Sequence, residues 1–574
     1  MKTKFKMLNP KVLPGLILLF YSLVTQAQTY INPLVIPPLM TGQQFQLDID
    51  TGSVPLLPGF RTLTYGFNGA YLGPTLELTK GDQVSITINN HLTEESSVHW
   101  HGLHVPAAMD GGPETIIPAG GTFVSSFDVM NPAATFWYHP HVHMNTEAQV
   151  EKGLAGFIII RDSSEATLNL PRDYGTDDFP IVLQDRSYSG SNQFIIGGLA
   201  DSMLVNGVIR PHLDVQSKVI RFRLLNGSSA RVYNLGFSDN RNFHVIAGDA
   251  SLLPEPFSTN RFILSNGERV EILVDFSGSV GDTIFLMSYA SELPTSVPGN
   301  MPGMMGNNGP LDGADFNILQ IGVIPPLPGG VTAIPLALVP VSTWDSSTVN
   351  KVRNRTITGQ GMASMGNFYL DGLQYIMGFV NDTMKLGDIE LWNISNFSNI
   401  SHPMHVHDVS FRILARNGMT PPGYESGWKD VFNILPQETV TIIMRFQDFA
   451  DATVPYMYHC HNLAHEDMGM MTSFIVIDTA TSGTSSHQHS PPSYLFPNPS
   501  TSYWDVMMEV GHDEEYELTV SDLAGRVLKI ISGRKSHHPI RMETADLPSG
   551  CYVVEMKLPQ NGDRKVMRGI VAHD

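Results

Sequence analysis

The 574-residue chain carries 55 acidic and 35 basic side chains, and its formal net charge of -20 argues against the basic surface that nucleic-acid binding needs. A chain of this length exceeds one hydrophobic core and indicates several domains. Its 51 glycines, 39 prolines and many short apolar runs favour an all-β fold over a helical one. With only two cysteines, Cys460 and Cys551, the sequence implies no disulfide framework.

The N-terminus has the pattern of a secretory signal peptide over residues 1–27. Lysines form a positive n-region, residues 12–24 are mostly apolar, and Ala27 ends a small-residue cleavage site. The apolar run is too short for a good transmembrane helix, and Pro14 interrupts its start. We therefore expect an exported protein that is soluble once mature.

Short strand patterns divide the remaining chain into β modules separated by linkers. Residues 74–78 and 84–88 alternate apolar with polar side chains, as half-buried strands do. Residues 219–224 and 270–274 are strands of a second module, which contains no His-x-His pair. The expected boundaries are 30–162, 176–325 and 334–478 for three β domains, 479–492 for a Ser/Thr-rich linker and 493–574 for a small β module.

The first and third domains look like diverged copies of one another. Gly81-Asp82 precedes the pair His99/His101 by the same eighteen residues that separate Gly387-Asp388 from the pair His405/His407. Later in each domain, a Tyr-His-x-His sequence is followed by an apolar closing strand. Two similar domains that carry matched histidine pairs predict a site shared at their interface.

Four His-x-His pairs occur in these two domains: His99/His101, His139/His141, His405/His407 and His459/His461. Residues two apart on a strand point the same way, so each pair can direct two imidazoles to one place. One such pair alone is more often an ordinary surface feature, but four repeated pairs indicate metal ligands. His487, His489, His537 and His538 lie in the linker and tail, and we interpret them as solvated.

Cys460 lies between His459 and His461, so its sulfur points to the opposite face of the strand. His465 and Met470 follow within ten residues. A cysteine, two histidines and a distant methionine form a blue-copper electron-transfer site, which leaves a second histidine to come from elsewhere. One short stretch can therefore serve two metal sites on opposite faces.

Four segments, at 99–102, 139–141, 402–407 and 459–470, resemble the copper-binding motifs of the multicopper oxidases, a family that includes laccases, cuprous oxidases and bilirubin oxidases. The resemblance covers residues 30 to 478. It implies an all-β fold of three cupredoxin-like Greek-key β-barrel domains, to which the tail adds a small β-sandwich. It also implies four copper ions per chain, one of type 1, one of type 2 and two of type 3.

Carried onto this sequence, the resemblance implies a complete ligand set. Type 1 copper would be bound by His402, Cys460 and His465 with Met470 axial, type 2 by His99 and His405, one type 3 ion by His101, His139 and His461, and the other by His141, His407 and His459. One chain supplies all ten histidines, which disfavours a two-domain arrangement of the nitrite-reductase kind.

The resemblance further implies that a donor gives single electrons to the type 1 copper and that dioxygen is reduced to water at the other three. Glu466 and Asp110 match acidic positions that resemble the family's proton-relay residues. Asp430, in Trp428-Lys429-Asp430, resembles a segment near the type 1 copper where an acid can contact an organic donor, although a turn acid is an equal interpretation.

The sequence indicates the class of electron donor less directly. Methionines at 301, 304, 305, 362 and 365 could hold cuprous ion or simply fill space. The positions before His402 read Ser398-Asn399-Ile400-Ser401, without the Asp and Met of the family's cuprous oxidases. This favours a laccase-like oxidase of phenols over a cuprous-ion oxidase in copper detoxification. A copper-sequestering surface protein without turnover is the alternative from another class, and we expect a monomer in each case.

The tail resembles the C-terminal sorting domain of the type IX secretion system. The resemblance rests on segments at 494–500, 520–527 and 547–554, and a generic accessory β-sandwich is the alternative. It implies the secretion machinery as a partner, with passage through the periplasm and then secretion or display at the outer membrane.

Overall fold

The computed structural model describes residues 30–301 and 309–479, and in the tail 494–496, 500, 502–507, 515–522, 526–534, 540–558 and 563–571. The expected signal peptide, Met304, Met305, nearly all of the expected linker, and the histidines at 487, 489, 537 and 538 lie outside these residues. The chain forms two compact units, which meet in sequence between Ile477 and Asp478. None of the helices in the described ranges could cross a membrane.

The first sandwich of the larger unit contains β2 (Leu39–Thr41), β3 (Gln44–Val54), β4 (Thr62–Phe67), β5 (Thr75–Thr79), β6 (Gln83–Asn90), β7 (His99–His101), β8 (Thr122–Asp128), β9 (Ala134–His139) and β10 (Gly156–Arg161). Its sheets have the orders β4-β3-β6-β8 and β2-β5-β10-β9-β7 and share one apolar core. Buried residues alternate along β6, as the sequence predicted, because one face packs on that core. The short helices α1 (Ala107–Asp110) and α2 (Thr146–Lys152) lie in its loops.

The second sandwich contains β1 (Asn32–Pro33), β11 (Asp178–Tyr188), β12 (Phe194–Ile195), β13 (Ser202–Val205), β14 (Val208–Ile209), β15 (Pro211–Gln216), β16 (Val219–Asn226), β17 (Tyr233–Phe237), β18 (Phe243–Ala247), β19 (Leu252–Thr259), β20 (Phe262–Leu264), β21 (Arg269–Asp275), β22 (Thr283–Ser288) and β23 (Phe316–Ile324). Helices α3 (Ser163–Ala166) and η1 (Ala290–Glu292) flank it. One sheet centres on β11-β16-β21, and the other runs β1-β15-β23-β22-β17-β20. Val331 and Leu338 also pack in this core, beyond the Pro/Gly-rich segment.

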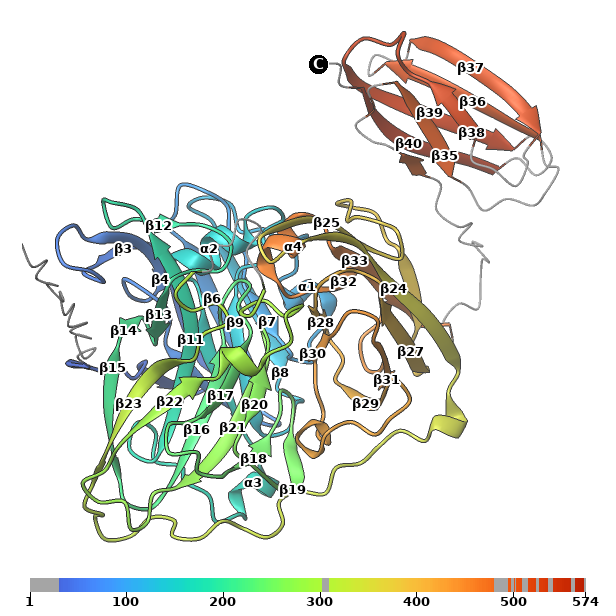
Figure 1. The fold of residues 1–574 in the computed structure, drawn as a ribbon. Helices are drawn as coiled ribbons and strands as arrows, with labels where there is room; N and C mark the ends of the chain where they lie inside the picture. The colour runs from blue at the N-terminus through green and yellow to red at the C-terminus, as the bar shows by residue number, and fades with distance from the viewer. Residues whose placement is uncertain are drawn as a thin grey trace, which may run out of the picture. The chain divides into compact units, whose positions relative to one another are not determined.

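The third sandwich contains β24 (Lys351–Met362), β25 (Met365–Leu370), β26 (Asp382–Lys385), β27 (Ile389–Asn396), β28 (His402–Val406), β29 (Phe411–Arg416), β30 (Val431–Ile434), β31 (Thr439–Arg445), β32 (Asp451–Cys460) and β33 (Met471–Ile477). It also holds α4 (Leu463–Asp467) and the turns η2 (Ser346–Thr348) and η3 (Gly423–Glu425). Its sheets have the orders β25-β24-β27-β31-β29 and β26-β33-β32-β28-β30. β7 and β9 of the first sandwich lie beside β28 and β32 of the third (Figure 1).

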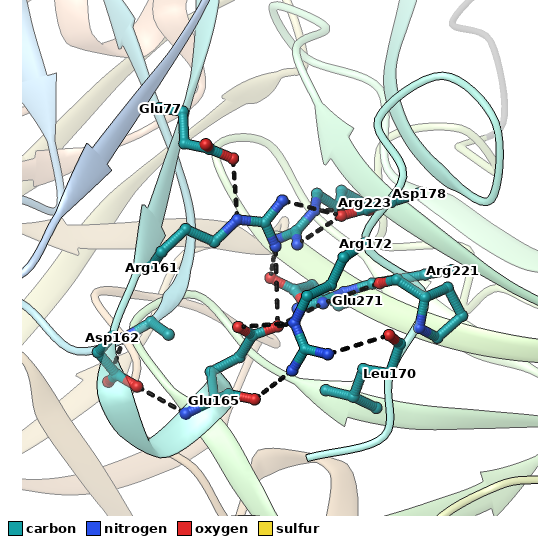
Figure 2. A network of polar contacts seen from close by, with 12 residues as sticks. Glu77, Arg161, Asp162, Glu165, Leu170, Arg172, Asp178, Arg221, Arg223 and Glu271 are labelled. Carbon is teal, nitrogen blue, oxygen red and sulfur yellow. Dashed lines mark hydrogen bonds and ion pairs between the residues drawn. The ribbon is translucent and has the colours of Figure 1, made fainter. Parts of the chain in front are cut away.

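A buried network of charges joins the first sandwich to the second (Figure 2). Arg223 of β16 binds Asp178 at 2.7 Å and Glu271 at 2.7 Å, and it also donates to Thr135 Oγ1 of β9. Arg161 of β10 reaches Asp178 at 3.3 Å. Burial opposes ionisation of Asp178, but the surrounding arginines lower its pKa to about 2. Because a lone buried charge is costly, these pairs hold the two sandwiches in one arrangement.

The C-terminal unit is a smaller sandwich with strands β34 (Tyr494–Phe496), β35 (Tyr503–Met507), β36 (Glu515–Asp522), β37 (Val527–Arg534), β38 (Ile540–Glu543), β39 (Gly550–Leu558) and β40 (Asp563–Val571). Its sheets run β34-β35-β38 and β37-β36-β39-β40. Trp504, Val520 and Val554 lie in its core. The predicted all-β class is therefore confirmed in both units.

Candidate metal centre

Eight histidines from the four His-x-His pairs meet where the first and third sandwiches touch, and all are buried. Strand pairing brings them together, because His99 on β7 is opposite His139 on β9 and His405 on β28 is opposite His459 on β32. His101 follows on the same face of β7, and His141, His407 and His461 lie one or two residues beyond the ends of β9, β28 and β32. Residues more than 300 positions apart in the sequence thus form one cluster.

The shortest contacts divide the ring nitrogens of this histidine cluster into three groups. The contacts are His99 Nε2–His405 Nε2 at 3.4 Å, His101 Nδ1–His139 Nε2 at 3.3 Å, His101 Nδ1–His461 Nε2 at 3.2 Å, His141 Nε2–His459 Nε2 at 3.3 Å and His407 Nε2–His459 Nε2 at 3.2 Å. Wider combinations, such as His99 with His405 and His407, also fall within ligand range of one another, so the groups are contiguous.

The chemistry of the cluster fits metal ions. Burial lowers the pKa values of His101, His139, His141, His405, His407 and His461 well below the ordinary 6.5, which keeps these rings neutral. Neutral ring nitrogens that face one another need a shared cation or proton, since lone pairs repel. Imidazole suits copper, zinc, iron and nickel.

Outer hydrogen bonds orient several of these rings toward the cluster. His99 Nδ1 donates to the carbonyl of Asp110 at 2.9 Å, and His405 Nδ1 donates to the carbonyl of Asp430 at 2.8 Å. His407 Nδ1 donates to the Asp110 carboxylate at 2.7 Å. A proton on the outer nitrogen leaves the lone pair of the inner nitrogen free for a metal, as is usual in metalloproteins.

A second candidate centre lies in the third sandwich. Cys460 Sγ is 3.4 Å from His402 Nδ1 and 3.7 Å from His465 Nδ1, and all three residues are buried. Ligand atoms that each lie roughly 2.0–2.3 Å from one ion have such separations. The outer nitrogens are again held, His402 Nε2 by the Ser398 hydroxyl at 2.9 Å and His465 Nε2 by the Met362 carbonyl at 2.9 Å.

Met470 lies beside Cys460, whose backbone N–H donates to the Met470 carbonyl at 3.1 Å, and both side chains belong to the core of the third sandwich. His459 and His461 contact the histidines of the first sandwich instead. Cys460, the last residue of β32, therefore belongs to one centre, while its neighbours His459 and His461 belong to the other. Burial raises the pKa of the Cys460 thiol, so a cation must replace the proton for a thiolate to form.

Glu466 and Asp110 flank the histidine cluster on different sides. Glu466 is buried, with one oxygen 3.5 Å from His141 Nδ1 and the other 3.2 Å from His459 Nδ1. Burial disfavours its charge, but the neighbouring imidazoles lower the pKa of Glu466. Asp110 contacts His407 and His99. Two carboxylates thus lie within reach of the ring nitrogens.

The suggestion that Asp430 contacts an organic donor is wrong. Its side chain is fully buried, with Oδ1 only 3.3 Å from His101 Nε2. It also forms an ion pair with Arg269 of the second sandwich, with oxygen–nitrogen distances of 2.6 Å. The segment turns inward because this arginine, which no local motif marks, receives the carboxylate. Arg269 is a site residue that the sequence analysis missed.

Comparison with known proteins places the chain in one class. Family models described as "Multicopper oxidase" match residues 49–165 and 343–480, and a model described as "Secretion system C-terminal sorting domain" matches residues 494–571. The multicopper oxidase mco of Staphylococcus haemolyticus is 33% identical over 422 residues, which cover 71% of this chain and 83% of that protein. The cell division protein FtsP of Escherichia coli is 31% identical, with 78% and 93% covered.

Solved structures agree with this result. A laccase-like multicopper oxidase, CueO from Ochrobactrum sp., superposes with a TM-score of 0.69 at 32% identity, covering 78% of this chain and 100% of its own. The McoA multicopper oxidase of Aquifex aeolicus gives a TM-score of 0.70 at 30% identity, covering 78% and 100%.

The fold and its two centres define an oxidoreductase built from three cupredoxin-like β domains. The chain belongs to the multicopper oxidase family, and its C-terminal unit is a type IX secretion sorting domain. Membership of this family implies copper as the metal.

Proposed function

We propose that the protein is a secreted, laccase-like multicopper oxidase that takes single electrons from phenols or similar donors and reduces dioxygen to water. Type 1 copper is assigned to His402, Cys460, His465 and Met470. Type 2 copper is assigned to His99 and His405, and the type 3 pair to His101, His139 and His461 and to His141, His407 and His459. The three groups of closest nitrogen contacts support this division.

The observation that carries the proposal is the geometry of residues 459–461. Copper, when bound, supplies the one-electron redox chemistry that both half-reactions need. The chain itself connects the two centres, since Cys460 belongs to one while His459 and His461 belong to the other. Glu466 and Asp110 lie beside the cluster, where their carboxylates can take up protons and pass them to the site of oxygen reduction.

The laccase-like choice rests on the surroundings of the Cys460 centre. His402 is held by Ser398, and the acid and thioether typical of a cuprous-ion entry path do not precede it. The Ochrobactrum relative is described as oxidising lignin model compounds and lignosulfonate, which favours an aromatic donor here by similarity.

A cuprous-ion oxidase is the second candidate, and one observation favours it. The turn at residues 362–365 covers His465 and carries a methionine at each end, of which Met365 is 58% exposed. Two thioethers at the electron-entry side could receive Cu(I).

The sorting domain supports secretion or display at the outer surface. We further propose that the N-terminal segment is a signal peptide that directs the chain through the periplasm, and that the folded enzyme is a monomer.

Oxygen uptake by copper-loaded protein tests the function, with a phenol, Cu(I) and bilirubin as separate donors. We expect uptake with the phenol, no uptake by Cys460→Ser, and four coppers per wild-type chain by metal analysis. Uptake with Cu(I) alone would reverse the ranking of donors. Full copper loading without uptake from any donor would show sequestration instead of catalysis.

A further inference from the structure

Arg269 connects all three sandwiches at the edge of the histidine cluster. It is 1% exposed, and each of its five N–H groups has a partner. Its Nε donates to the carbonyl of Thr135 in the first sandwich at 3.0 Å. Nη1 and Nη2 bind the two oxygens of Asp430, which directly precedes β30 of the third sandwich, at 2.6 Å each. The guanidinium is therefore fixed, and it fixes the carboxylate in turn.

Asp430 holds two of the candidate ligands through two different groups. Its backbone carbonyl accepts from His405 Nδ1 at 2.8 Å, and its Oδ1 lies 3.3 Å from His101 Nε2. His101 is reversed relative to the other seven histidines of the cluster, because its Nδ1 faces His139 and His461. The ring can present a free Nδ1 lone pair only if Nε2 carries the proton, and Asp430 is the acceptor placed to hold that proton there.

Two glycines make room for this arrangement. A Cβ on Gly102 would lie 2.2 Å from Asp430 Oδ2 and 2.9 Å from Arg269 Nη2, and its φ of +85° favours glycine. A Cβ on Gly267, in the turn before β21, would lie 2.9 Å from the His461 ring. The backbone on both sides is thus built around the ion pair and the cluster.

We propose that Arg269 is a positioning residue of the three-copper centre, which acts through Asp430 to fix the tautomer of His101 and the orientation of His405. The second sandwich supplies none of the candidate ligands, yet through Arg269 it controls the geometry of the centre. This inference rests on the proposed function, since it assigns the histidine cluster to copper.

Three variants test the proposal: Arg269→Lys, Asp430→Asn and, as a matched control, Arg223→Lys. A lysine keeps the charge at 269 but cannot bind both carboxylate oxygens. An asparagine at 430 keeps the shape, but its NH₂ group must face Arg269 Nη2, or both Arg269 Nη1 and His101 Nε2. Arg223 is equally buried and also joins two carboxylates, those of Asp178 and Glu271 (Figure 2). It also donates to Thr135 Oγ1, but it contacts none of the eight histidines of the cluster.

Copper affinity is measured by chelator competition, and the type 2 ion is followed by electron paramagnetic resonance. The visible absorption of the Cys460 centre serves as an internal standard for folded protein. We expect both site variants to lose roughly 10- to 100-fold in copper affinity at the cluster and to change the type 2 spectrum, while the thiolate absorption stays. Arg223→Lys should melt at a lower temperature with a native spectrum.

The proposal would be overturned if both site variants kept the wild-type copper affinity and type 2 spectrum. An equal change in Arg223→Lys would also overturn it, because this would indicate a general loss of packing between the sandwiches. Wild-type protein that binds no copper at the histidines would instead overturn the proposed function and this inference together.

Discussion

The proposed role of Glu466 in proton transfer can be tested separately from copper binding. Glu466→Gln keeps the shape beside His141 and His459 but cannot carry a proton. We expect oxygen consumption to fall roughly 10²- to 10⁴-fold, the usual contribution of general acid–base catalysis. Anaerobic reduction of the Cys460 centre by the donor, followed by its visible absorption, should be unchanged. An equal loss in both half-reactions would contradict the assigned role.

Glu147 at the start of α2 makes stability depend on pH. Burial, together with Glu151 and Asp467, raises the pKa of Glu147 to about 8 from the ordinary 4.5. Between these pH values the folded state holds a proton on Glu147 that the unfolded state releases. The contribution of protonated Glu147 to the free energy of unfolding is therefore fully present below about pH 4.5 and is lost as the pH rises through about 8. Glu147→Gln should raise the melting temperature at about pH 9 and leave it nearly unchanged at about pH 5. The exposed Glu255→Gln is the control, and a gain independent of pH would argue against this explanation.

At the level of single residues, candidate ligands could be predicted from the sequence where their spacing along a strand identifies them. The four His-x-His pairs and Cys460 could be placed because strand alternation decides which side chains share a face. Asp430 and Arg269 could not be placed. Their roles depend on a contact between two residues 161 positions apart, and an isolated acid or arginine has no spacing that reveals its partner.

Among the elements, α4 carries His465 and Glu466, and Asn462 caps its N-terminus. The Asn462 side chain accepts from the His465 N–H and donates to the Ala363 carbonyl at 2.8 Å, so it also holds the turn that covers His465. Asn462→Ala should cost about 1 kcal/mol of stability and speed copper loss from the Cys460 centre. Chelator-driven decay of the visible absorption measures that loss.

The matched control is Asp162→Ala, which removes the cap of α3 far along the chain from the Cys460 ligands. It should lower the melting temperature by a similar amount without changing copper release. Equal release rates in the two variants would mean that Asn462 is only a helix cap.

Strand alternation predicted the first sandwich better than it could predict the second. β6 alternates because one of its faces is covered. β16 is buried along its whole length, and Arg221 and Arg223 lie inside because they pair with acids from β11, β21 and α3. From the sequence alone, an arginine on such a strand would be predicted to face solvent, because its acidic partners lie on other elements. Interfaces between sandwiches are therefore the part of the fold that periodicity does not reveal.

At the scale of the whole molecule, the larger unit is complete at β33. This strand ends at Ile477 and pairs with β26 and β32, while every candidate ligand lies before it. A chain that ends at residue 479 should match the full chain in copper content, visible absorption and oxygen uptake. A chain that ends at residue 470 lacks β33 and should neither hold copper nor fold stably. Loss of activity in the longer truncation would show that the sorting domain contributes to the enzyme.

The pairing of His99 with His405 across 306 residues also sets an order of events during biogenesis. Each of the three nitrogen groups in the cluster combines a histidine before residue 142 with one after residue 404. A nascent chain therefore cannot assemble the oxygen-reducing centre until its third sandwich has been made and has closed on the first. Contacts of such long sequence separation also form slowly. Metal insertion at the histidine cluster must therefore follow the synthesis of the third sandwich and its closure on the first.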